Sequence, residues 1–248
     1  MCMMKQKLRD AYARCYYQQS GFPRKVLSDD AAAVMLTKEE IADYRYGLAP
    51  YSQAQIKKHV RDFNVAQVIV TDAYVSGAAM VEAIHGADRM VSVGGGYSTL
   101  CSRLAAAKIS RYEIFDIEDA DILEDKYARL ERVGAATEGI TKIPLEEGFL
   151  EKLRFNKKMF WDLTGCSDLK LVQELGSRLT YDSAVVFVYR GEYLELEKML
   201  SDWGFRIYEY SSGEELETRF FDKANFGPVQ YQLKVEREMN MVLAVKKP

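Results

Sequence analysis

Three consecutive glycines directly after a short apolar run constrain the fold of this chain more than any other feature. Residues 89–93 predict a buried strand, and Gly94, Gly95 and Gly96 predict a tight turn after it. Residues 99–108 are compatible with a short helix, and residues 112–116 predict a second strand. A strand, a turn, a helix and a strand make a βαβ unit, which packs in a parallel sheet.

The apolar runs further along the chain predict a larger sheet. A predicted helix over residues 192–202 ends at Gly204, and a strand follows it. A final strand comes about 30 residues later, which suits a last strand inserted antiparallel between its neighbours. The remaining predicted strands cover residues 140–143, 158–163, 183–189, 205–210 and 239–245. We therefore expect an α/β, Rossmann-like sheet of seven strands, mostly parallel with an antiparallel last strand.

Helical and polar patterns dominate the chain before the first predicted strand. Thr37 and Glu40 have the spacing of a capping box, in which each side chain accepts a bond from the other residue's backbone N–H. Apolar residues at helical spacing predict a helix over residues 72–85, which Gly86 ends. We interpret residues 1–64 as an N-terminal helical extension and residues 65–248 as one Rossmann-like domain.

Composition and charge limit the classes of function. A length of 248 residues suits one α/β domain with a sizeable core. The formal net charge of −3 provides no strong attraction to nucleic acid or to an anionic membrane, so we expect neither as a partner. The sequence has no signal-peptide core and no membrane-spanning apolar stretch, which predicts a cytoplasmic protein. No disulfide framework or metal site is predicted, because the cysteines are scattered without a CxxC pair: Cys2, Cys15, Cys101 and Cys166.

The glycine run and one downstream acid have the chemistry of a nucleotide-like site. Consecutive glycines let a ligand approach the backbone, and the next helix offers N–H groups to a carboxylate or a phosphate. Asp116 lies about 20 residues past Gly96, the spacing at which an acid binds ribose hydroxyls, although it could also be a cap or turn residue. A dinucleotide fold would place a third glycine where Thr99 stands, so the turn fits a nicotinamide cofactor poorly.

Several short motifs resemble those of the leucine carboxyl methyltransferase family. Residues 93–99 are similar to its Leu-Gly-Ala-Gly turn, with Arg103-Leu104 at the matching distance. Residues 112–116 resemble its Tyr-x-Glu-Val-Asp strand. Other similar segments are Asp29-Asp30-Ala31, Lys38, residues 47–51, and Trp203-Gly204-Phe205 with the final strand.

The resemblance implies a class I methyltransferase domain that binds S-adenosyl-L-methionine and releases S-adenosyl-L-homocysteine. The glycine turn, Asp116 and the adjacent Ile117 would then contact the cofactor. Tyr97 would cover it or pack under the turn. Lys38 would reach the methionine carboxylate, unless it is simply an exposed helix lysine. Leu145 stands where the family has its adenine-side motif.

The resemblance further implies O-methylation of a carboxylate, at a protein C-terminus or on a small acid. Trp161 and Asp162 lie near the end of the strand predicted over residues 158–163, at the edge where ligands gather, so they are the substrate-side candidates. A carboxylate is already ionised at neutral pH, and no catalytic base is therefore predicted. A hydroxyl acceptor would need a base, for which His59, His85 or a buried carboxylate are available.

Departures from the family pattern leave two alternatives open. The family's aspartate after the glycine turn is Ser98 here, and its arginine before the turn has no secure counterpart near residues 71–74. One alternative is therefore a degenerate methyltransferase-fold protein that binds the cofactor or a partner without turnover. The other is a nicotinamide-dependent oxidoreductase, disfavoured by the missing glycine and the long N-terminal extension.

Overall fold

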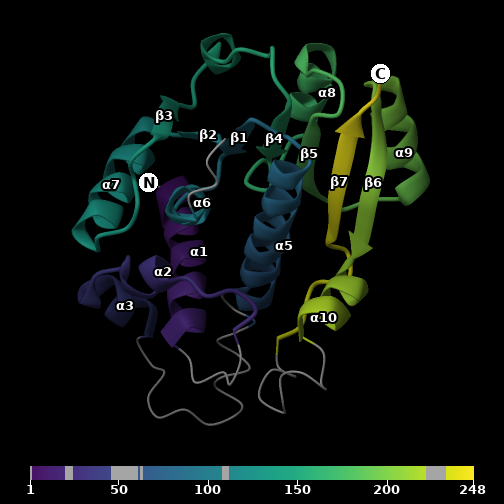
Figure 1. The fold of residues 1–248 in the computed structure, drawn as a ribbon. Coiled ribbons are helices and arrows are strands. Elements are labelled where there is room, and N and C mark those ends of the chain that lie inside the picture. Colours follow the sequence, from purple (N-terminus) through teal and green to yellow (C-terminus); the bar gives the residue numbers. More distant parts are fainter. Residues whose placement is uncertain (1, 20–24, 46–60, 62–63, 108–111, 222–232) are drawn as a thin grey trace.

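A seven-stranded sheet in the order β3-β2-β1-β4-β5-β7-β6 forms the centre of the molecule (Figure 1). The computed structural model describes residues 2–19, 25–45, 61, 64–107, 112–221 and 233–248. The strands are β1 (Arg89–Val93), β2 (Glu113–Glu118), β3 (Ile140–Pro144), β4 (Met159–Asp162), β5 (Ala184–Tyr189), β6 (Phe205–Ser212) and β7 (Asn240–Lys246). The first five pair in parallel, whereas β7 lies between β5 and β6 and is antiparallel to both. This confirms the predicted mostly parallel sheet with an inserted antiparallel last strand.

Helices cover both faces of the sheet, because the strands bury apolar side chains on both sides. The helices are α1 (Cys2–Gln19), α2 (Asp30–Val34), α3 (Lys38–Arg45), α5 (Val65–Ile84), α6 (Leu100–Ala106), α7 (Ala120–Arg132), η1 (Phe149–Lys152), α8 (Lys170–Arg178), α9 (Tyr193–Asp202) and α10 (Gly213–Phe221). Residues of α1, α5, α6, α7 and α10 share one apolar core with one face of the sheet. Residues of η1, α8 and α9 form a second core on the other face.

The N-terminal helices pack into the first of these cores. Tyr12 and Tyr17 of α1 and Met35 after α2 are almost fully buried, in the same cluster as Val70 of α5. At the start of α3, Thr37 and Glu40 form the predicted capping box, with N···O distances of 2.8 and 3.2 Å. The extension is therefore built into the apolar core that covers the sheet.

Strand β2 runs two residues beyond its predicted end. Its last three residues, Asp116, Ile117 and Glu118, are all buried. Side chains alternate between the faces of a strand, so Asp116 and Glu118 share one face and Ile117 points to the other. Glu118 therefore occupies the carboxyl end of the strand, where the sequence predicted Asp116.

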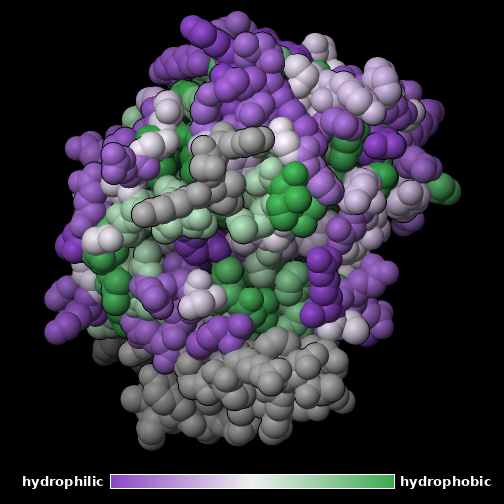
Figure 2. Space-filling model, viewed as in Figure 1, coloured by the Kyte–Doolittle hydropathy of each residue, from purple (hydrophilic) through white to green (hydrophobic). Residues whose placement is uncertain are grey.

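Hydrophilic side chains cover most of the face drawn in Figure 2, and hydrophobic ones gather near its middle. Among the helices that the structure describes, none has the length and apolar character needed to cross a membrane.

Candidate functional site

A cavity of about 600 Å³ lies at the carboxyl edge of the parallel strands. Gly94 and Gly95 line it after β1, and Asp162 and Thr164 line it at the end of β4. Helices α1 and α5 close another side through Arg14 and Asp72, among other residues. In open α/β sheets ligands bind at this edge, so the cavity is the candidate functional site.

The turn after β1 and the loop after β4 touch through glycines. Gly94 and Gly96 have φ angles of +70° and +57°, in the region that side-chain-bearing residues rarely adopt. A Cβ on Gly165, in the loop after β4, would lie 2.1 Å from the carbonyl oxygen of Gly94. Only a residue without a side chain permits this contact, so Gly165 helps to form the cavity wall. No sequence pattern indicates the role of Gly165, because the contact joins segments about 70 residues apart.

Glu118 at the end of β2 holds the glycine turn. Its Oε2 accepts a hydrogen bond from the backbone N–H of Gly96 at 2.6 Å, and its Oε1 accepts one from Asp119 at 2.9 Å. Backbone bonds attach the neighbouring segments, with Gly94 N–H donating to Ile117 and Leu145 N–H donating to Glu118 at 2.9 and 2.8 Å. The acid next to the glycine turn is therefore Glu118.

Asp116 lies deeper, in a buried ion pair. Its Oδ2 accepts bonds from Lys126 Nζ at 2.6 Å and from the Tyr127 hydroxyl at 2.8 Å, both on α7. Asp116 is 0% exposed and Lys126 2% exposed. Burial lowers the pKa of Lys126, but nearby acidic groups, with Asp116 foremost, together raise it more, so the net shift is upward. This placement gives Asp116 a structural contact with α7 instead of an opening onto the glycine turn.

The sequence of β2 indicates that Glu118, and not Asp116, is the acid next to the glycine turn. The family's Glu-Val-Asp matches Asp116-Ile117-Glu118 as acid, aliphatic, acid. With the predicted strand ending at residue 116, the family's second acid falls on Asp116, two residues before Glu118. With the strand extended to Glu118, the first acid takes the buried position and the second reaches the turn.

Tyr97 and Lys38 lie apart from the cavity. The Tyr97 hydroxyl donates to Asp125 of α7 at 2.6 Å, and the ring is 1% exposed beneath the Arg129 guanidinium. Tyr97 therefore packs under the turn, which was the second of its two interpretations. Lys38 is an exposed residue in the first turn of α3, which matches the plainer of its two interpretations.

Asp162 and Trp161 separate to opposite faces of the sheet. Asp162 lines the cavity, where its carboxylate accepts bonds from Thr164 N–H, the Thr164 hydroxyl and the Ser92 hydroxyl at 3.0, 2.7 and 3.0 Å. Burial raises its pKa above the usual aspartate value, against the lowering by these bonds. Trp161 is 0% exposed and stacks on Phe155, with ring centroids 6.0 Å apart. Of these two substrate-side candidates, only Asp162 faces the cavity.

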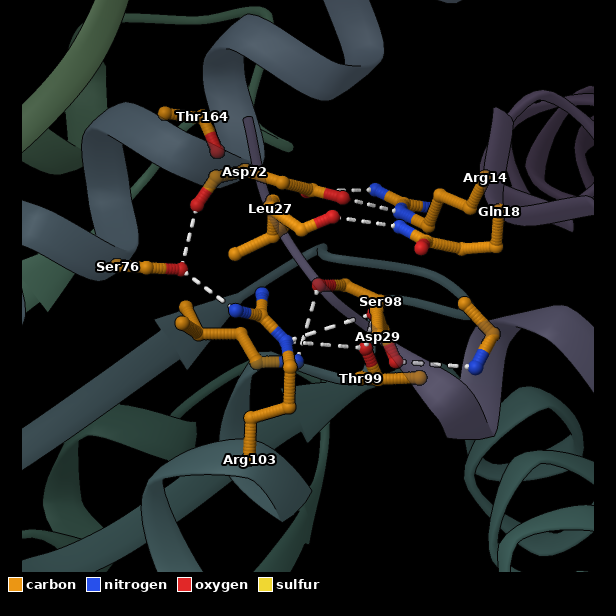
Figure 3. A network of polar contacts seen from close by, with 12 residues as sticks. Arg14, Gln18, Leu27, Asp29, Asp72, Ser76, Ser98, Thr99, Arg103 and Thr164 are labelled. Atoms are coloured by element: carbon orange, nitrogen blue, oxygen red, sulfur yellow. Dashed lines mark hydrogen bonds and ion pairs between the residues drawn. The ribbon is translucent and has the colours of Figure 1, made fainter. Parts of the chain in front are cut away.

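Arg14 of α1 contributes a cation to the cavity that the sequence did not predict. Its Nε and Nη2 donate to the two carboxylate oxygens of Asp72 on α5, at 2.6 and 3.1 Å. Figure 3 shows the two side chains facing each other, with Ser76 and Arg103 continuing the polar network toward Thr99. The pair joins residues 58 positions apart, so no local motif could reveal it.

His85 does not line the cavity. His85 is exposed at the end of α5, which precedes β1, so it lies at the amino edge of the sheet. His59 and the family-like residues 47–51 are outside the described residues.

The strand order, the inserted antiparallel β7 and the glycine turn after β1 define a Rossmann-like fold of the class I methyltransferase type. The family model for leucine carboxyl methyltransferases matches residues 7–168, more than half of the chain. The chain belongs to the leucine carboxyl methyltransferase family. The matched region starts within α1, so it includes Arg14 and the N-terminal helices.

Solved structures are similar to this chain at low sequence identity. A precorrin-6y C5,15-methyltransferase from Geobacter metallireducens GS-15 has 14% identity and a TM-score of 0.46, with 68% of this chain and 87% of that chain covered. A SAM dependent methyltransferase from Aquifex aeolicus has 12% identity and a TM-score of 0.46, with 69% and 89% covered. No curated protein matches the chain.

Proposed function

We propose that this protein is an S-adenosylmethionine-dependent methyltransferase that methylates an oxygen atom, with a carboxylate as the acceptor. The observation that carries the proposal is the cavity in which the glycine turn after β1 and Asp162 after β4 lie together. Strands β1 and β4 are neighbours, so a cofactor bound at the end of β1 and a methyl acceptor bound at the end of β4 would lie next to each other. The family assignment supports the same reaction class.

The residues around the glycine turn fit the cofactor. Gly94 and Gly95 line the cavity without side chains, so a ligand can approach their backbone. We assign the ribose hydroxyls to Glu118, because it is the acid bonded to the turn and each carboxylate oxygen can accept more than one bond. Leu145, a partly exposed apolar residue beside Glu118, and Ile117 are the candidates for the adenine side. Asp116, Tyr97 and Lys38 are not assigned to the cofactor.

The protein's part in the reaction is alignment and exclusion of water. When bound, the cofactor would supply a sulfonium methyl group: the acceptor oxygen bonds the methyl carbon as the C–S bond opposite it breaks, and the thioether S-adenosylhomocysteine leaves. The walls formed by α1, α5 and the two glycine loops would hold the acceptor oxygen against that methyl group. A carboxylate acceptor is ionised at neutral pH, so no residue needs to remove a proton.

A hydroxyl acceptor is the second candidate, and Asp162 favours it. Its pKa is raised by burial, and a carboxylate with a raised pKa is a better proton acceptor. In that reaction Asp162 would take the hydroxyl proton as the oxygen attacks the methyl carbon. The bonds from Ser92 and Thr164 hold the carboxylate in place for this role.

The sheet topology disfavours a nicotinamide-dependent oxidoreductase. The dinucleotide fold has strand order 3-2-1-4-5-6 without an inserted antiparallel strand. Here β7 separates β5 from β6 and is antiparallel to both. A degenerate cofactor-binding protein remains the alternative that the assay below distinguishes.

Transfer of tritium from methyl-labelled S-adenosylmethionine tests the function. The purified protein is incubated with panels of small carboxylic acids, peptides with free C-termini, and alcohols. Methyl esters release labelled methanol in mild base, whereas methyl ethers do not. We expect base-labile product and little effect of Asp162→Asn on turnover. Base-stable product that Asp162→Asn abolishes would establish the hydroxyl acceptor, and cofactor binding without transfer to any acceptor would favour the degenerate protein.

A further inference from the structure

Arg14 has one nitrogen that the protein leaves without a hydrogen bond. The residue is 8% exposed and lines the cavity. Nε and Nη2 bond Asp72, but Nη1 is buried and has no hydrogen-bond partner among the described residues. A buried charged donor without an acceptor costs more than an ordinary hydrogen bond contributes, so this position suits an acceptor from a ligand.

The guanidinium is held as a cation in a fixed orientation. Burial lowers the pKa of Arg14, but the carboxylates of Asp72, Asp10 and Asp29, with Asp72 foremost, together raise it more. Two parallel bonds to one carboxylate also fix the plane of the guanidinium. A planar guanidinium that already binds one carboxylate can bind a second through its remaining edge.

The position of Arg14 indicates which end of the cofactor it would meet. Asp72 lies on α5, the helix that leads into β1 and the glycine turn. Ser76, one turn further along α5, donates to the Asp72 carbonyl and accepts a bond from Arg103 of α6, the helix that follows the turn. Arg14 therefore belongs to the wall on the glycine-turn side, while Asp162 and Arg190 line the cavity at the ends of β4 and β5.

We propose that Arg14 binds the amino-acid carboxylate of S-adenosylmethionine, and that Asp72 positions the guanidinium for this contact. The inference rests on the proposed function, since it assigns one part of the same site. It makes the N-terminal helix α1 a supplier of a cofactor-binding residue as well as a part of the core. The methyl acceptor would then occupy the part of the cavity beside Asp162.

A comparison of two ligands in two variants tests this contact. The ligands are S-adenosylhomocysteine and S-adenosyl-3-thiopropylamine, which differ only by the carboxylate. Their dissociation constants are measured by calorimetry for the wild type, Arg14→Gln and Arg14→Lys. Arg9→Gln is the matched control, because it removes the same charge from an exposed position of the same helix. The ratio of the two constants within one variant cancels general damage to the fold.

We expect the wild type and Arg9→Gln to prefer S-adenosylhomocysteine by roughly 10- to 100-fold, the size of a charge-assisted hydrogen bond. Arg14→Gln should bind both ligands about equally, and Arg14→Lys should lie between. A preference in Arg14→Gln as large as in the wild type would overturn the assignment of Arg14 and leave the proposed function standing. Failure of the wild type to bind either ligand would instead refute the proposed function. If Arg14→Gln does not fold, the ratio of the two dissociation constants is compared between Arg14→Lys and the wild type. Equal ratios in these two proteins would overturn the proposal.

Discussion

Two acidic residues of β2, Asp116 and Glu118, share one face of the sheet but have different partners. Asp116 bonds Lys126 and Tyr127 of α7 in the core, and Glu118 bonds the backbone of Gly96 in the turn. The two side chains differ in their position along the strand. Residues two apart point to the same face of the sheet, but Glu118 lies closer to the carboxyl end of β2 than Asp116 does. Their substitutions should therefore have different consequences.

Asp116→Asn should destabilise the protein without a specific effect on the cofactor. The substitution leaves the Lys126 ammonium, which is 2% exposed, without its counter-charge. Breaking a buried pair in this way costs about 3–5 kcal/mol, measured here as the free energy of unfolding in urea. The double variant Asp116→Asn, Lys126→Met should recover part of the loss. If Asp116→Asn is as stable as the wild type but no longer binds S-adenosylhomocysteine, Asp116 and not Glu118 would be the ribose-binding acid.

Glu118→Gln should weaken the binding of S-adenosylhomocysteine. The amide loses the charge that strengthens bonds from ribose hydroxyls, so we expect an affinity lower by about 1–3 kcal/mol. Asp121→Asn is the control, because it removes an acid from an exposed position in the first turn of α7. Calorimetry compares the two variants. Equal affinities in both would exclude Glu118 from the ribose site.

Asp162 should make the stability of the protein depend on pH. Burial raises its folded-state pKa above that of the unfolded chain, near 3.9, so the folded state binds the proton more tightly. Its contribution to stability is therefore present below about pH 4 and is lost as the pH rises through the folded-state pKa. Urea unfolding at several pH values should show the wild type losing stability relative to Asp162→Asn as the pH rises. A difference that stays constant with pH would contradict this environment for Asp162.

At the scale of elements, the strands could be predicted more closely than the loops that carry the site. Residues 89–93, predicted as a strand, are β1, because apolar residues followed by glycine mark both the strand and its end. The end of β2 was placed two residues early, because acids at 116 and 118 resemble the start of a polar loop, whereas both are buried. The contact of Gly94 with Gly165 depends on the order of strands, and no local pattern contains it.

Gly165→Ala should damage the wall between the loops after β1 and β4. A Cβ there would lie 2.1 Å from a backbone oxygen that cannot rotate away, so the loops must separate. Overpacking of this kind costs about 1–3 kcal/mol, and S-adenosylhomocysteine should bind more weakly as the turn shifts. The matched control is Gly77→Ala in α5, where a Cβ meets nothing within 4 Å.

The control variant, Gly77→Ala, should raise the free energy of unfolding, whereas Gly165→Ala should lower it. Gly77 is exposed within α5, so alanine there should stabilise the protein by about 0.5–1 kcal/mol and leave ligand affinity unchanged. Similar unfolding midpoints for Gly165→Ala and Gly77→Ala would show that the two loops do not need the glycine contact.

At the scale of the whole molecule, the sequence predicted the sheet but not how the N-terminal helices contribute to the site. The class of fold follows from the order of apolar runs and glycines, which is local information. The pair of Arg14 with Asp72 and the pair of Arg129 with Glu40 join segments 58 and 89 residues apart. Such pairs depend on how helices pack around the finished sheet, so a single sequence does not reveal them.

The binding of S-adenosylhomocysteine by the purified protein, compared with the binding of NAD, tests the central claim most directly. Both ligands are titrated calorimetrically under the same conditions. The cavity between the glycine turn and Asp162, in a sheet with an inserted antiparallel strand, predicts micromolar binding of S-adenosylhomocysteine and no binding of NAD. Binding of NAD with no binding of S-adenosylhomocysteine would contradict it.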